Sequence, residues 1–88
     1  MSSRRAYGED TLAIMDRFFR ALDACKEAGM LRYVDFCRCC GVPRSHFYTQ
    51  RKDRHRGYFE VGWLVPLVRD YGVSAHWLLT GKGMMFNM

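Results

Sequence analysis

The sequence predicts a compact all-α domain of five short helices. Apolar residues recur at intervals of three and four along most of the chain, which is the spacing that lines one face of a helix. Glycines separate these segments, and no stretch alternates apolar and polar residues as a half-buried strand would. The 88 residues suffice for one domain with one modest core. Because 49% of them are apolar and six are phenylalanine, we expect that core to be packed.

The first helix is expected to begin after a cap at Asp10 or Thr11. Its core-facing stripe consists of Met15, Phe18, Phe19, Leu22 and Cys25. The other face is charged, so we expect the stripe to pack into the core. The charged residues of that other face are Asp16, Arg17, Arg20, Asp23, Lys26 and Glu27. Gly29 is expected to end the helix.

The middle of the chain has the pattern of a helix-turn-helix. A first helix is expected over 32–40, and Gly41 can adopt the positive φ that ends it within one residue. Pro43 suits the first position of a second helix, expected over 43–51 with Phe47 turned inward. The inward face of the first helix consists of Tyr33, Phe36, Cys37 and Cys40. Two short helices around a glycine turn, the second rich in polar side chains, are typical of this motif.

Two further helices are expected after a polar loop. The first has an apolar stripe of Val61, Leu64, Leu67, Val68 and Tyr71. A start near Gly62 or Trp63 places Pro66 in the first turn, where its missing N–H costs nothing; an earlier start requires a kink. Ser74 is a good N-cap for the last helix, expected over 75–80.

The ends of the chain differ in composition from this helical region. Residues 1–9 include Arg4 and Arg5 but little apolar content, so we expect a flexible basic arm. The folded domain is expected over 10–83. Residues 84–88 form an apolar tail, which either contacts another molecule or folds back onto its own core.

Positive charge is concentrated in one part of the chain. The formal net charge is +5, and the segment from Arg44 to Arg56 alone holds five basic side chains against one aspartate, a net +4. A concentrated basic patch favours a polyanionic partner, whereas a solvated basic loop is the plainer alternative. Because the patch is continuous with the helix-turn-helix, we favour the polyanion.

Several other functional classes find no support in the sequence. No apolar run approaches the ~20 residues of a membrane span, and no basic-then-apolar leader opens the chain, so we expect a cytoplasmic protein without a membrane partner. No histidine accompanies a nucleophile and a carboxylate in a catalytic pattern, and no glycine-rich phosphate loop occurs. We therefore expect no enzymatic activity and no cofactor.

The four cysteines, Cys25, Cys37, Cys39 and Cys40, do not have the spacing of a metal site. The cluster lacks the paired Cys-x2-Cys arrangement, and no second pair of ligands follows. Cys37 falls where the two central helices approach most closely, which requires a small side chain. We expect reduced thiols and no bound metal.

A known family shares several residues between positions 29 and 83. They are Phe36, the small Cys37, Gly41-Val42, Arg44-Ser45, Phe47 and the closing run Tyr71-Gly-Val-Ser-Ala-His-Trp-Leu-Leu-Thr-Gly-Lys-Gly83. In these residues the chain resembles the lambda-repressor-like, or Cro/XRE-type, DNA-binding domains of bacteria and phages. The resemblance implies a five-helix lambda-repressor-like fold with a central helix-turn-helix. It also implies sequence-specific binding of double-stranded DNA by a transcriptional regulator, most simply a repressor.

The resemblance also implies which side chains meet the DNA. At the matching positions of the second central helix, family members place side chains in the major groove. The residues expected to read bases are Arg44, Ser45 and Thr49, flanked by His46 and Tyr48. The residues expected to hold phosphates are Tyr33, Arg51, Lys52 and Arg54. A symmetric homodimer on a palindromic site is expected, with Met84, Met85 and Phe86 as one candidate interface.

Two rival functions remain open. A helix-turn-helix domain can lose DNA binding and serve as a protein-interaction module of the antitoxin or anti-repressor kind, which would favour a neutral or acidic face on the second central helix. Arg44, Arg51 and Lys52 argue against that interpretation. A binder of structured RNA is the third alternative.

Overall fold

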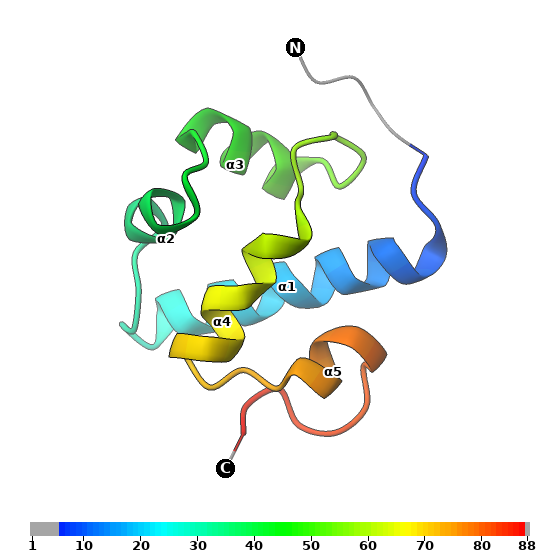
Figure 1. Ribbon diagram of the computed structural model, residues 1–88, viewed down its shortest axis with the longest axis vertical. Helices are drawn as coiled ribbons and strands as arrows, with labels where there is room; N and C mark the ends of the chain where they lie inside the picture. Colours follow the sequence, from blue (N-terminus) through cyan, green and yellow to red (C-terminus); the bar gives the residue numbers. More distant parts are fainter. Residues whose placement is uncertain (1–5, 88) are drawn as a thin grey trace.

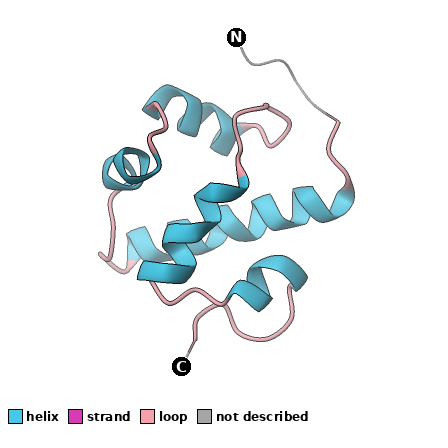
Figure 2. Ribbon diagram, in the orientation of Figure 1, coloured by secondary structure: helices cyan, strands magenta, loops and turns pink. Residues whose placement is uncertain are grey.

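The longest helix, α1, is the element against which the rest of the molecule packs (Figure 1). The computed structural model describes residues 6–87. The elements are α1 (Glu9–Glu27), α2 (Tyr33–Cys40), α3 (Arg44–Lys52), a 3-10 turn η1 (Val61–Trp63), α4 (Leu64–Asp70) and α5 (Ala75–Thr80). Over the described residues the regular elements are all helical, as Figure 2 shows, which confirms the prediction of an all-α chain. None of these helices has the length and apolarity needed to cross a membrane.

Helix α1 begins earlier than the sequence predicts. Its N-cap is Gly8, which offers no side-chain cap, so the expectation of a cap at Asp10 or Thr11 is wrong. Glu9 and Asp10 instead lie in the first turn, where carboxylates interact favourably with the helix dipole. The Tyr7 hydroxyl donates to the carbonyl oxygen of Arg56 at 3.1 Å. Glu9, assigned to the arm expected over 1–9, is therefore part of α1, whereas Arg4 and Arg5 of that arm lie outside the described residues.

The turn between α2 and α3 has the conformation expected of glycine. Gly41 adopts φ 66° and ψ 30°, and the N–H of Val42 returns to the carbonyl of Cys37 at 3.0 Å. Pro43, with ψ 139°, is the N-cap of α3 and not its first residue, so α3 begins one position later than predicted. Cys37 is 3% exposed, as expected for a small side chain between the two helices.

The C-terminal helices follow the sequence at their ends but not along the whole inner face. Val61 and Val68, expected on the apolar stripe that faces the core, are 77% and 36% exposed, so that part of the prediction is wrong. Pro66 is the third residue of α4 and so falls in its first turn, as predicted for a late start. Ser74 caps α5 by accepting a hydrogen bond from the backbone N–H of Trp77 at 3.1 Å. Trp63 and Trp77 are both buried in the core, so neither is available as a stacking platform for unpaired bases.

The C-terminal segment folds back onto the domain. Val73 and Phe86 form an antiparallel bridge, and the N–H of Ser74 donates to the carbonyl of Met85 at 2.8 Å. Met85 and Phe86 pack against the core, whereas Met84 is 64% exposed. Of the two alternatives for this segment, folding back is the one observed, and residues 84–87 belong to the domain.

Replacing Gly41 with alanine should lower the free energy of unfolding by about 1–2 kcal/mol, because alanine resists a left-handed conformation. No atom lies within 4 Å of a Cβ placed at Gly41, so backbone strain is the whole expected cost. Gly62 is the matched control, since it is equally open but lacks a positive φ. Urea denaturation of both variants measures the difference, and an equal loss would contradict this account of the turn.

Candidate nucleic-acid interface

Helix α3 has a sharply divided surface. Phe47 and Gln50 are completely buried on its inner side. The side chains on the outer side are Arg44, Ser45, Tyr48 and Lys52, all exposed, and the half-buried Thr49. Residues four positions apart on a helix share a face, so most of the predicted base-reading residues are brought together on one outer surface.

Aromatic packing sets the orientation of α3. The ring of Phe47 lies 5.2 Å from that of Tyr33, 5.7 Å from Phe36, 5.9 Å from Phe19 and 6.1 Å from Trp63, between centroids. These contacts join α3 to α1, α2 and η1. Rotation of α3 would break several of them at once, so the outer face is held in one direction.

The buried amide of Gln50 anchors the loop that follows α3. Its Nε2 donates to the carbonyl oxygen of Arg54 at 2.9 Å, and its Oε1 accepts from the backbone N–H groups of Tyr58 and Phe59 at 2.9 and 3.2 Å. A buried amide with these partners is satisfied, whereas an unpartnered one would be costly. Gln50 was not among the predicted site residues, although its position three residues after Phe47 indicates that its side chain faces inward.

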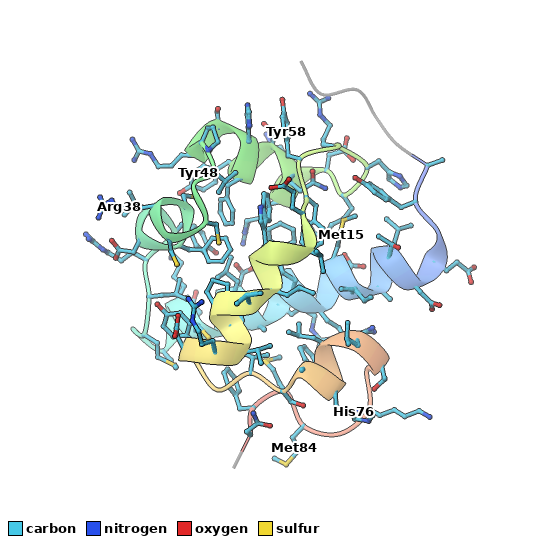
Figure 3. All side chains as sticks on the ribbon, in the orientation of Figure 1. Met15, Arg38, Tyr48, Tyr58, His76 and Met84 are labelled. Carbon is cyan, nitrogen blue, oxygen red and sulfur yellow. The ribbon has the colours of Figure 1, made fainter. Side chains whose placement is uncertain are left out.

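His46 faces the loop as well as the solvent. Its imidazole stacks on the Tyr58 ring, with centroids 4.0 Å apart and planes inclined by 14°. Tyr48 packs edge-on against Tyr33 at 6.0 Å. Figure 3 places Tyr48 and Tyr58 at the same end of the molecule. Tyr58, which was not among the predicted site residues, therefore borders the outer face of α3.

Tyr33 and Arg51, both predicted to hold phosphates, are joined to α1 through Asp23. The Tyr33 hydroxyl donates to Asp23, and the Arg51 guanidinium forms an ion pair with the same carboxylate at 2.7 Å. The guanidinium carbon also lies 5.5 Å from the centroid of the Tyr33 ring. Burial, and then the hydrogen bond to Asp23, raise the pKa of Tyr33 to about 12. Tyr33 is therefore a neutral hydrogen-bond donor at physiological pH.

Arg54 is held against α1 in a similar way. Its Nε lies 2.7 Å from a carboxylate oxygen of Asp16, and its guanidinium carbon lies 4.3 Å from the centroid of the Phe19 ring. The side chain also donates to the backbone carbonyl of Arg51. Two arginines of the basic segment are thus compensated by carboxylates of α1. Within the described residues, Arg44 and Lys52 are exposed cations without such an ion pair.

The cysteines do not converge with other ligands. Cys25 and Cys37 are buried, Cys40 is partly buried and Cys39 is exposed. In the part of the chain that the structure describes, no group of three or more His, Cys, Asp or Glu side chains could hold a metal ion. Desolvation raises the pKa of the Cys37 thiol above its ordinary value, which is typical of a buried thiol that packs as a small apolar group.

Comparison with known proteins identifies no relative of this chain. No protein-family model, no curated protein and no solved structure matches it. The lambda-repressor-like fold expected from the sequence therefore remains a prediction. What the protein binds has to be inferred from α2, α3 and the loop that follows them.

Replacing Gln50 with leucine should lower the free energy of unfolding by about 1–3 kcal/mol, because buried N–H groups of the loop lose their acceptor. Hydrogen exchange should accelerate at the amides of Tyr58 and Phe59, and urea denaturation measures the stability. Lys52→Leu is the matched control on the outer face, with an expected change within about 0.5 kcal/mol. Unchanged exchange at Tyr58 and Phe59 in the Gln50 variant would contradict the anchoring role.

Proposed function

We propose that the protein binds double-stranded DNA at specific sequences and acts as a transcriptional regulator, most simply a repressor. The observation that carries the proposal is the polar, exposed outer face of α3, held in one direction by Phe47 and Gln50. A short helix presented in this way after a tight turn can lie in the major groove, while the preceding helix braces it against the backbone. A regulator of bacterial or phage type would work in the cytoplasm.

Base recognition is assigned to the outer side of α3 between Arg44 and Thr49. Arg44 lies in its first turn and is exposed, so its guanidinium can pair bidentately with O6 and N7 of guanine. Ser45 and Thr49 follow on the same side and are less selective, because a hydroxyl both donates and accepts. Tyr48 and His46 flank this group and can contact bases or the sugar-phosphate backbone.

Phosphate contact is assigned first to Lys52. It is exposed at the C-terminal end of α3 and has no carboxylate partner among the described residues. Arg51 and Arg54 are paired with carboxylates of α1, so much of their charge is already compensated. We give these two arginines mainly the role of fixing α3 on α1, with phosphate contact second.

A homodimer on a palindromic site follows from the size of α3. Its nine residues reach only a few base pairs. Two copies related by a two-fold axis double the recognised sequence and bind half-sites about one helical turn apart. We therefore propose two protomers on each specific site.

The proposal is tested by selecting bound sequences from a random duplex pool and then competing the selected duplex against single strands and folded RNA at one salt concentration. Enrichment of a palindromic motif with preference for the duplex is expected. Stronger binding of folded RNA, or no enriched motif, would contradict the proposal.

Arg44→Ala should weaken binding to the selected site by about 1–3 kcal/mol and relax the preference at one base position in each half-site. Affinity for scrambled DNA should change much less. Arg20→Ala serves as the control, since Arg20 is exposed on α1 and lies over Trp77. Equal losses on selected and scrambled duplexes would show that Arg44 contacts phosphate and does not read a base.

Lys52→Ala should weaken binding to selected and scrambled duplexes alike, and reduce the slope of log affinity against log salt by about one unit per protomer. Lys82→Ala is the control, because Lys82 is exposed and follows α5, the helix that lies toward the opposite end of the molecule from α3. Titrations at several salt concentrations give both slopes. An unchanged slope in the Lys52 variant would remove Lys52 from the phosphate contacts.

A further inference from the structure

An exposed apolar groove of about 330 Å³ runs between α4 and α5. Four of its large apolar lining residues are exposed: Val61, Val65, Val68 and Leu79, at 77%, 48%, 36% and 55%. Large apolar side chains are rarely gathered on the surface of a soluble domain unless they meet another molecule. The groove is therefore a candidate interaction surface.

The valines of this groove lie on the side of α4 that faces away from α1. Trp63, Pro66 and Leu67 form the buried side of η1 and α4. Figure 1 shows α4 in front of α1, and α3 and α5 toward opposite ends of the molecule. The groove residues come from neither α2 nor α3. A partner in the groove would thus leave the outer face of α3 available to DNA.

Opposite charges stand at the two ends of this valine stripe. Glu60 precedes it and Arg69 follows it, and both line a second hollow together with Val65. They therefore lie on the same side of the stripe. Asp70 accepts from Nε and Nη2 of Arg69 at 3.0 and 2.8 Å, and the Arg69 side chain also interacts with the exposed Cys39.

We propose that the occupant of this groove is a second copy of the chain, bound with the two α4 helices antiparallel about a two-fold axis. A two-fold contact uses the same patch on both copies, so the patch must be complementary to itself. With the axis passing near Val65, Val61 faces the partner's Val68 and Glu60 faces the partner's Arg69. The two-fold axis reverses the direction of the partner's helix but keeps Glu60 and Arg69 of both copies on the same side of the contact. The pair between Glu60 and the partner's Arg69 therefore forms twice.

This inference deepens the proposed function and rests on its requirement for two protomers. Helix α4 has seven residues, about 10 Å of helix, which is short for an interface that is stable on its own. We expect a weak dimer in solution, which binding to two adjacent half-sites would strengthen.

Sedimentation equilibrium without DNA tests the dimer, over protein concentrations from micromolar to millimolar. The wild type should show a monomer–dimer equilibrium, and Val65→Glu should raise its dissociation constant by more than about tenfold, because the carboxylate would be buried against apolar side chains. Met30→Glu is the matched control: Met30 is 46% exposed, outside the groove, and the charge change is the same. Circular dichroism and the unfolding midpoint verify that each variant is folded.

The antiparallel register is tested by exchanging the charges. Glu60→Arg and Arg69→Glu should each weaken the dimer, and the double variant should restore it. Two results would overturn the dimer: a wild type that stays monomeric at millimolar concentration, or equal dissociation constants for Val65→Glu and Met30→Glu. If the single charge exchanges leave the dissociation constant unchanged, the antiparallel register is wrong. Because these measurements contain no DNA, such failures are distinct from equal losses on selected and scrambled duplexes in Arg44→Ala, which would count against base reading in the proposed function.

Discussion

The outer face of α3 depends on the burial of the inner face beneath it, where Phe47 packs into the core and the amide of Gln50 is fully hydrogen-bonded. This amide ties the inner side of α3 to backbone groups of Arg54, Tyr58 and Phe59, so that helix and loop form one unit. The stacked ring of Tyr58 then positions His46 at the border of that face. Since leaving a buried polar group unsatisfied costs more than a made hydrogen bond contributes net, the loop and α3 are expected to order together.

The positive charge of the central segment has two roles in this account. Arg51 and Arg54 connect α3 to Asp23 and Asp16 of α1, which keeps the helix in place but compensates their charge. Arg44 and Lys52 stand at opposite ends of the outer face and remain open to solvent. Charge counted along the sequence therefore overstates the charge available to a polyanion, and the structure identifies where the available part lies.

Local features of the fold were predictable from the sequence, and long-range contacts were not. Helical spacing located the helices, Gly41 ended α2 as expected, and Ser74 capped α5, because each depends on neighbouring residues alone. The pairing of Arg51 and Arg54 involves carboxylates 28 and 38 positions away, so no local pattern reveals it. The position of α3 was predicted closely, but the dependence of its outer face on Gln50 was not, because the partners of Gln50 are backbone groups of a loop.

Nuclear magnetic resonance of the protein titrated with its selected duplex tests the central claim most directly. We expect the largest changes in backbone amide shifts along α3, at Arg44, Ser45, Tyr48, Thr49 and Lys52, whether or not α4 also responds to dimer formation. Specific binding that leaves the amides of α3 unperturbed, with the changes confined to α1 or α5, would contradict it.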